Sequence, residues 1–523
     1  MKTQIQKIIG LLTVSSLLFM SCETVDFGDE NLNPNAVSKA NTGALITASM
    51  RSIPSIVSNI DSGVLYAQHV SEITYNDESC YETIQWNFDG FYTGPLMNLQ
   101  TVIDLNTTDP DSYNSSGSAG MQMGVAHLLQ VYMFHVMTDR WGAIPYSEAL
   151  KGVNMLKPKF DDQEDVYMGM FAQIDAALGM LDGGGLSGDF MFNGDAAKWK
   201  KFGNTMKMVM ALRIADVDGA TAQAKFIEAH NGGVLSSVAD NVHYPYTAAD
   251  DNDSPWQDRF QSRDDYATSN TMVNHLVSTS DPRLHKFAVP VVTQGGASKG
   301  VEYKTMDGKT YGGMPYGWMS PGILQSWVSY LPDAVIKTSA ATQGGMLYSY
   351  AQVAFSYAEA AHRGWIPASA GTKQQWYEIG INASMAQWGV SAADAATYVA
   401  AAPAATVESI ATEKWIALYM QGWEAWSEWR RLDFPKLTVA RDILTGTGIP
   451  VNTHVQAIPT TGASSNGTIT LSNNASVAGT GTTFSFGARI FIVYLGKQLL
   501  TPSTTEDDTV PFSEHFSGNN NTV

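Results

Sequence analysis

The pattern of apolar positions predicts helices along most of the chain. Residues 122–137, QMGVAHLLQVYMFHVM, are apolar on nearly every side and carry no turn residue after Gly124, which predicts a buried helix. Similar blocks occupy residues 166–181, 196–216, 347–365, 373–389 and 407–432. Several blocks are neighbours, and SYAEAAHRG at 356–364 has the Tyr, Ala and Gly spacing of tetratricopeptide-like hairpins. No strict repeat period follows, so we expect a mainly α fold of tetratricopeptide-like helix pairs that form a scaffold.

Two regions break this helical pattern. Between about 217 and 345 the chain is rich in Gly, Asp, Asn, Ser, Pro and aromatic residues, as in KTYGGMPYGWMSPG. Binding residues are concentrated on loops carried by a rigid scaffold, so we expect an irregular, loop-rich ligand-binding lobe there. Residues 438–523 form a second irregular region, which we expect to pack on the same domain.

The N-terminus has the pattern of an export signal. Lys2 and Lys7 precede an apolar run from Ile8 to Met20, which is shorter than the roughly 20 residues that span a bilayer. Ser21 and Cys22 follow in a lipobox-like arrangement. Cys80 is the only other cysteine in the sequence, so the exported chain has one cysteine beyond the signal and cannot form an internal disulfide with it alone. We therefore expect a lipoprotein signal peptide at 1–21 and a lipid on Cys22. An acidic flexible tether at 22–42 then leads to the helical domain at 43–437.

Composition narrows the classes of partner. The net charge is −19, with 31 Lys+Arg against 50 Asp+Glu, which excludes a nucleic-acid partner because phosphate binding needs a basic surface. The chain also has 13 Trp, 22 Tyr and 20 Phe but only 15% charged residues. Such a surface is compatible with neutral ligands, either carbohydrates or peptides, although acidity also simply keeps exported proteins soluble.

Catalytic and metal motifs are mostly absent from the sequence, and no cofactor is expected. GASKG at 296–300 matches a nucleophile elbow, but the following residues do not form the helix that this motif requires. The segment DDNDSPWQD resembles the start of a calcium loop. Pro255 and Gln261 stand where an EF-hand has Gly and Glu, which leaves only an irregular calcium site open. We expect no enzymatic activity.

Several segments together resemble one family. DRWGAIPYSEAL at 139–150 is similar to the hallmark of the SusD/RagB outer-membrane lipoproteins of Bacteroidetes. In the family's order follow WKKFGNTMKMVMALR, DPRL, SYAEAAHRG and EKWIALYMQGWEAWSEWRRLDFPKL, so the resemblance covers about residues 43 to 437. The last eighty or so residues depart from it, with a long polar insertion and ARIFIVYLGK in place of the family's usual ending.

The resemblance implies a function and a partner. Family members are cell-surface lids on a SusC-like TonB-dependent transporter of the outer membrane, and they capture oligosaccharides, or sometimes peptides, for import. Three functions remain open at this point: a glycan-binding lipoprotein, a peptide-binding lid and a lipid-anchored secreted hydrolase.

The hallmark itself is interpreted as structural. We expect Trp141, Ile144, Pro145 and Tyr146 to pack the turn that leaves a core helix. Asp139 and Arg140 are interpreted as a local ion pair or the end of that helix.

Ligand-binding residues are expected among the loop aromatics. A sugar ring stacks on an aromatic ring while polar side chains bind its hydroxyl groups, so the rings must be exposed. Seven tryptophans lie in helical patterns and are assigned to packing: Trp199, Trp365, Trp388, Trp415, Trp423, Trp426 and Trp429. The ligand-binding candidates lie in polar or turn-rich segments: Trp86, Asp253, Trp256, Tyr311, Tyr316 and Trp318.

Overall fold

A computed structural model describes most of the chain. The described residues are 39–58, 62–81, 87–296, 300–317, 322–337 and 345–437, with the backbone of four short strands at Ile443–Thr445, Thr453–Ala457, Thr470–Leu471 and Ser485–Phe486. The chain divides into the units Met1–Asn41 and Thr42–Val523, and every element below belongs to the second unit.

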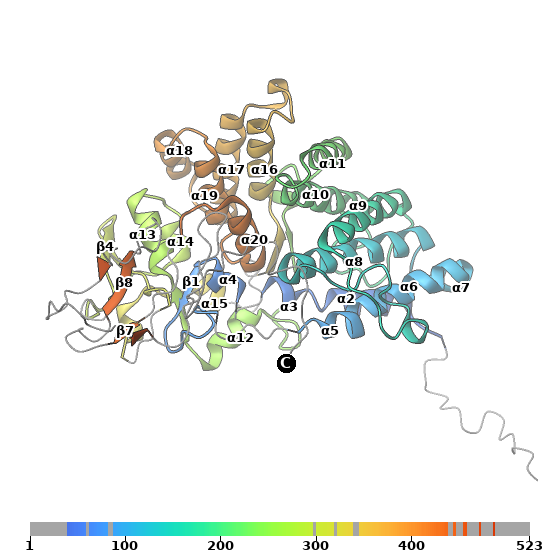
Figure 1. Cartoon of the computed structure of the whole chain (residues 1–523), viewed down its shortest axis with the longest axis horizontal. Helices are drawn as coiled ribbons and strands as arrows, with labels where there is room; N and C mark the ends of the chain where they lie inside the picture. Colours follow the sequence, from blue (N-terminus) through green and yellow to red (C-terminus); the bar gives the residue numbers. More distant parts are fainter. Residues whose placement is uncertain are drawn as a thin grey trace, which may run out of the picture. The chain divides into compact units, whose positions relative to one another are not determined.

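Helices dominate the described residues, which confirms the mainly α fold (Figure 1). The first group is α2 (Thr42–Met50), α3 (Pro54–Val57), α4 (Gly63–Tyr66), α5 (Asp89–Phe91), α6 (Met97–Thr108), α7 (Pro110–Tyr113), α8 (Ala119–Trp141), α9 (Gln163–Met180), α10 (Ala196–Arg213) and α11 (Gly219–Gly232). The middle group is α12 (Pro255–Ser262), α13 (Asn270–Ser278), α14 (Leu284–Phe287) and α15 (Asp333–Ile336). The last group is α16 (Tyr350–His362), α17 (Lys373–Gln387), α18 (Ala392–Ala401), α19 (Val407–Ala417) and α20 (Gly422–Leu432).

Short strands connect parts of the chain that are distant in sequence. β1 (Val70–Glu72) pairs antiparallel with β3 (Tyr266–Thr268), and β2 (Val242–His243) pairs with β6 (Met346–Tyr348). β4 (Tyr303–Met306) and β5 (Lys309–Gly312) form a hairpin. These two-stranded pairs position loops and do not form a sheet core.

Neighbouring helices pack as pairs, and polar side chains cap their starts. The main pairs are α6 with α8, α8 with α9, α10 with α11, and α16 with α17. Ser118 caps α8 by accepting from the Met121 amide, and Asp195 caps α10 by accepting from two amides. Thr372 and Gln375 form a capping box at the start of α17. The apolar stripes of these helices bury a core that runs through α2, α6 and α8 to α11.

The helices differ from the sequence prediction in several places. The block 407–432 is two helices, because Met420 adopts φ 71° and the chain turns before α20. A Cβ on Gly422 would lie 2.2 Å from the Val64 amide nitrogen, so this glycine allows α4 to approach α20. The block 347–365 begins as strand β6, and α11 is a regular helix inside the region predicted to be loops.

The hallmark DRWGAIPYSEAL forms the end of α8 and the turn beyond it. The helix continues to Trp141 and ends at Gly142, which has φ 72°, so Asp139 and Arg140 do not terminate it. Ile144 is buried and exchanges two backbone hydrogen bonds with Asp161, while Tyr92 donates to the Pro145 carbonyl at 2.5 Å. The turn is therefore a packed structural corner.

Asp139 belongs to a buried ion network and not to a pair with Arg140. Its carboxylate accepts from Arg213 Nε of α10 at 2.9 Å, and Tyr167 donates to it. Arg213 also pairs with Glu424 at 2.7 Å and with Glu428, both on α20. Further pairs join the network to α19 and α16: Lys414 with Glu428, Arg431 with Glu428, and Arg431 with Glu359. The network thus connects α8, α10, α16, α19 and α20.

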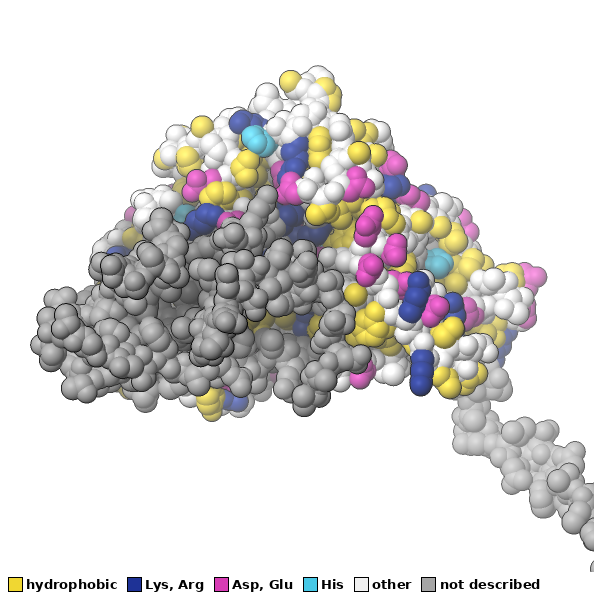
Figure 2. All heavy atoms as spheres, in the orientation of Figure 1, with side chains coloured by type: hydrophobic (Ala, Val, Ile, Leu, Met, Phe, Trp, Pro, Cys, Tyr) yellow, Lys and Arg dark blue, Asp and Glu magenta, His cyan; other side chains and the backbone are white. Residues whose placement is uncertain are grey.

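On the helical part visible in Figure 2, acidic and basic side chains are interspersed over the surface.

Candidate functional site

Three loops meet beside the β1–β3 pair. We call this surface the loop junction and define it as residues 73–81, 262–265 and 313–317. The β1–β3 register continues past the strands, because the Ile73 amide donates to the Asp265 carbonyl at 2.6 Å. Ser79 donates from its amide and its hydroxyl to the buried Glu72, which folds the first loop back on itself. Burial raises the pKa of Glu72, and these hydrogen bonds oppose the shift.

Tyr316 anchors the third loop to the first. Its hydroxyl donates to the Ser79 carbonyl at 3.2 Å, and its amide donates to Asn270 Oδ1 at 3.1 Å. Asn76 donates to the Gly317 carbonyl at 3.4 Å. The residue as a whole is partly exposed, and burial of its hydroxyl raises the pKa of that group. Tyr316 therefore holds the junction together as well as lining it.

Two of the predicted ligand-binding rings are core residues. Trp256 and Tyr311 are both 0% exposed, so neither offers a ring face to a ligand. Trp256 lies in α12, which packs on α15, and the Tyr311 hydroxyl hydrogen-bonds His285 Nδ1 at 2.6 Å. Their expected exposure was wrong because polar and glycine-rich neighbours in the sequence hid a second apolar core, around α12 to α15.

Trp86 and Trp318 lie outside the described residues. The described chain ends at Tyr81 and resumes at Asn87 around the first, and ends at Gly317 and resumes at Gly322 around the second. Both segments therefore begin in or directly after the loop junction.

Tyr75 is an exposed ring at the junction that the sequence analysis missed. It is 54% exposed, and the Arg263 guanidinium carbon lies 5.6 Å from its ring centroid. Arg263 is held in place by Asp265 at 2.5 Å. An open ring beside polar groups is the arrangement that sugar stacking requires. Its position in the polar segment ITYNDESCYE, between a strand and a turn, is the signal that could have revealed it.

Asp253 lies in a small acidic cluster. Ligand oxygens of Asp250, Asp253 and Asp258 are all within 4.8 Å of one another, and the residues are exposed or partly exposed. Burial, followed by the charges of Asp258 and Asp250, raises the pKa of Asp253. Three carboxylates at this spacing have the donor chemistry for calcium, although exposed acidic groups of this kind are common without an ion.

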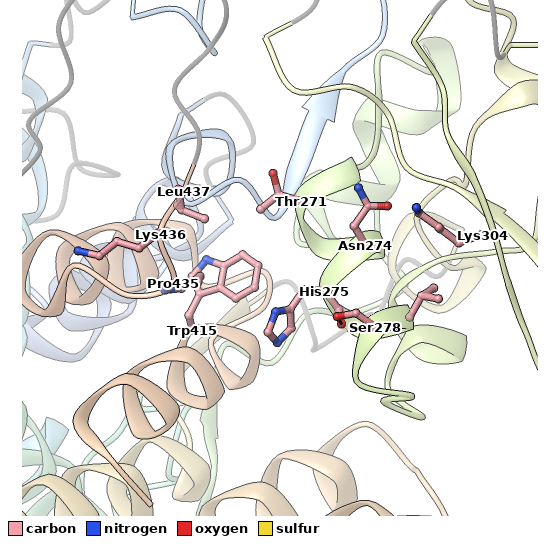
Figure 3. Close-up of a pocket in the computed structure, with 10 residues that line it drawn as sticks. Thr271, Asn274, His275, Ser278, Lys304, Trp415, Pro435, Lys436 and Leu437 are labelled. Atoms are coloured by element: carbon pink, nitrogen blue, oxygen red, sulfur yellow. Dashed lines mark hydrogen bonds between the residues drawn. The ribbon is translucent and has the colours of Figure 1, made fainter. Parts of the chain in front are cut away.

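A cavity of about 590 Å³ lies beside α13 (Figure 3). Thr271, Asn274 and Ser278 line it at helical spacing, and Lys304 of β4 contributes from the same side. Trp415, Pro435 and Leu437 supply apolar lining opposite, whereas Lys436 extends away from α13. No carboxylate is among the lining residues of the described chain.

Among the described residues that line the cavity, Asn274 carries a buried polar atom without a hydrogen-bond partner. The atom is the side-chain oxygen Oδ1, which is buried without a hydrogen bond to any described residue. Burial lowers the pKa of the neighbouring His275, which leaves this imidazole neutral at pH 7. The polar helix face and the apolar side opposite suit a ligand with hydroxyl groups and an apolar ring face.

The chain after Gly300 enters strand β4 and not a helix, as expected for GASKG without a nucleophile elbow. Residues 297–299 lie outside the described chain.

Comparison with protein families identifies the chain. The model of a SusD-like family, described as starch-binding and associating with the outer membrane, matches residues 34–453. The chain belongs to the SusD-like family. No described helix is long and apolar enough to cross a membrane. A comparison with curated proteins finds no match.

Solved structures of SusD-like proteins share the fold. A chitin-binding protein is 25% identical, with a TM-score of 0.65, and the match covers 76% of this chain and 88% of that one. A chitin-binding SusD homologue from Flavobacterium johnsoniae is 24% identical, with a TM-score of 0.61 and the same coverage. A SusD homologue from Bacteroides vulgatus is 21% identical over 76% of this chain and 86% of its own, with a TM-score of 0.62.

Proposed function

We propose that this SusD-like protein is a non-enzymatic lipoprotein of the cell surface. It captures oligosaccharides and delivers them to a SusC-like TonB-dependent transporter in the outer membrane. The observation that carries this proposal is the match to the structure of a chitin-binding protein, at 25% identity over 76% of this chain. The family to which this chain belongs is described as starch-binding.

The ligand-binding surface is proposed at the loop junction and the adjoining cavity. Tyr75 offers an exposed ring, and Trp86 and Trp318 belong to segments that begin at the junction. The first turn of α13 connects the loop junction and the cavity. Asn270 accepts a hydrogen bond from the Tyr316 amide in the junction, and the next residue, Thr271, lines the cavity. Asp253 remains a proposed polar contact.

Truncating a stacking ring should weaken glycan binding and leave the fold intact. We expect Tyr75→Ala, Trp86→Ala or Trp318→Ala to remove about 1 to 3 kcal/mol of binding free energy, by analogy with interface hot spots. This corresponds to a dissociation constant roughly five to 150 times weaker. Calorimetry with chitooligosaccharides and a panel of other neutral oligosaccharides measures the effect. Circular dichroism monitors folding.

Tyr113→Ala is the matched control, because Tyr113 is a partly exposed tyrosine on the scaffold helix α7. Its affinity should equal that of wild type. Wild-type affinity in all three ring variants would place the site elsewhere, and Asn274→Ala then tests the cavity alone. Binding of peptides but of no glycan would favour the peptide-binding alternative. Release of shortened product during long incubation would favour the hydrolase alternative.

The anchor is tested separately. Because Cys22 ends the apolar signal and precedes an acidic tether, Cys22→Ala should remove the lipid and release the protein from the membrane fraction. Fractionation and palmitate labelling of cells measure both effects, and Cys80→Ala is the matched control that keeps the anchor. Unchanged labelling and membrane association of Cys22→Ala would contradict a lipid at this residue.

A further inference from the structure

Arg140 is held by two tryptophan rings at the end of α8. Its guanidinium carbon lies 4.1 Å from the centroid of the Trp141 ring and 3.7 Å from that of the Trp423 ring. The side chain is partly exposed. Cation–π contact uses the flat face of a guanidinium, so the N–H groups along its edge remain available for hydrogen bonds.

Arg140 has no acceptor for these N–H groups within the described chain. It makes no hydrogen bond or ion pair with any described residue. The arginines at positions 51, 213, 259, 263, 283, 363 and 431 each pair with a carboxylate. Arg430 is the nearest comparison, because it stacks on Trp426 at 3.8 Å, but it donates to the Asp139 carbonyl at 2.6 Å. Among the arginines that the structure describes, Arg140 is the one held between rings with no acceptor for its N–H groups.

Arg140 stays positively charged, and the neighbouring carboxylate pairs with another residue. Burial lowers the pKa of Arg140 to about 10, which still leaves the group charged at pH 7. Asp139, the adjacent carboxylate, is directed to Arg213 instead. Arg140 is thus a positive charge without a carboxylate partner among the described residues, on a chain whose net charge is −19.

The residues around Arg140 also contact both ends of the segment that carries Trp86. Tyr81, which precedes this segment, stacks on Tyr66 with ring centroids 4.2 Å apart, and Tyr66 contacts Trp423 at 6.0 Å. Phe88, which follows the segment, contacts Trp141 at 5.3 Å. The described residues on the two sides of that segment, Tyr81 and Phe88, are therefore joined through ring contacts to the tryptophans that hold Arg140.

We infer that the Arg140 guanidinium binds a carboxylate of the captured ligand. The edge of a guanidinium presents two parallel N–H groups that match the two oxygens of a carboxylate, and the surrounding rings fix its orientation in advance. A uronic acid in an oligosaccharide and the C-terminus of a peptide both supply this group. The inference rests on the proposed function for the place of the ligand, and it adds that an acidic ligand is preferred.

Matched acidic and neutral probes test this inference on the full-length protein. We compare digalacturonic acid with its dimethyl ester, and a tripeptide acid with its C-terminal amide, by calorimetry at fixed ionic strength. For at least one pair, the wild-type protein should bind the acid at least about tenfold more tightly than the neutral ester or amide. This is the effect expected of a charge-assisted hydrogen bond. Arg140→Met should bind both members of that pair equally. Arg140→Lys keeps the charge but not the planar edge, and should lose most of the preference.

Arg51→Met is the control, because Arg51 is an exposed arginine paired with Asp251, and it should keep the wild-type preference. The acid and neutral probes are compared first on the wild-type protein, so this part of the test does not depend on whether a variant folds. Equal binding of acid and neutral probes by wild type, absence of binding by either acid, or a preference that persists in Arg140→Met would each overturn the inference. Binding of neutral oligosaccharides without acid preference overturns it but leaves glycan capture standing. Acid-dependent binding of the peptide alone supports the role of Arg140 and contradicts glycan capture.

Discussion

Replacing Arg213 by methionine is expected to lower the free energy of unfolding by about 3 to 5 kcal/mol, the cost of breaking a buried ion pair on one side. Arg213 is 9% exposed and pairs with Asp139, Glu424 and Glu428. Glu428 would keep Lys414 and Arg431 as partners, but Asp139 and Glu424 would lose their arginine. Urea unfolding measures the loss.

The pH dependence of the stability loss distinguishes the broken ion pair from a simple loss of packing. Burial alone would raise the pKa of Asp139, but Arg213 and then His135 outweigh burial and lower it. In wild type this carboxylate contributes stability above its unfolded pKa of about 3.9, and the contribution disappears as the pH falls through the lower folded pKa. Without the charge of Arg213, only the smaller contributions of His135, Tyr167 and Arg430 oppose burial, so we expect the folded pKa of Asp139 to rise above the unfolded one. As the pH falls, Asp139 in the folded variant then takes up a proton before Asp139 in the unfolded chain does. The loss of unfolding free energy in Arg213→Met, relative to wild type, should therefore shrink as the pH falls from 7 to 5.

His135 does not change this sign. It lies 3.3 Å from Asp139, and burial lowers its pKa, so it is neutral in wild type at pH 7. Protonation of His135 in the variant would also relieve the unpaired carboxylate as the pH falls. Arg51→Met is the control, since Arg51 and Asp251 are 46% and 73% exposed and such pairs contribute less than about 1 kcal/mol. A deficit below 1 kcal/mol for Arg213→Met, or one that stays constant with pH, would contradict the role of the network.

The network also shows what the sequence could not reveal. The helix at the hallmark is predictable because sixteen residues from Gln122 to Met137 are apolar on nearly every side. The partner of Asp139 is not predictable, because Arg213 is 74 residues away and only the packing of α10 on α8 brings the two together. The local pair with Arg140 followed from sequence proximity, yet adjacent residues on a helix point in different directions.

For residues 217–345, the sequence predicts less of the structure than it does for the helical scaffold. Loop composition correctly indicated turns around Pro315 and Gly317, but it did not distinguish rings that face solvent from rings that fill a small core. Trp256 illustrates the difficulty. The segment DDNDSPWQD is polar, yet Ser254 precedes α12, which packs on α15, and Trp256 is buried in the second apolar core. Tyr75, in an equally polar segment, stays exposed because its loop is tied back through Glu72 and Ser79.

Trp256 and Tyr75 should therefore respond in opposite ways to truncation. Trp256→Ala is expected to cost about 3 to 5 kcal/mol of stability, as for other buried aromatic side chains, because the cavity it leaves cannot fully close. Glycan affinity measured on the folded fraction should stay at the wild-type value, since a ring that is 0% exposed does not touch ligand. Tyr75→Ala should change stability by less than about 0.5 kcal/mol, as for other surface substitutions, and weaken glycan binding.

A conservative variant sharpens the test. The Trp256 Nε1 donor is buried without a hydrogen bond in the described chain, so Trp256→Phe removes an unsatisfied polar group while it keeps most of the apolar volume. We expect Trp256→Phe to cost less than about 1.5 kcal/mol, in the range of shape-conserving core substitutions. Thermal and urea unfolding give the stabilities, and calorimetry at a temperature where each variant is folded gives the affinities. Wild-type stability in Trp256→Ala together with lost glycan binding would return this tryptophan to the ligand site. Loss of both stability and affinity in Tyr75→Ala would mean that this ring supports the loop junction instead of binding sugar.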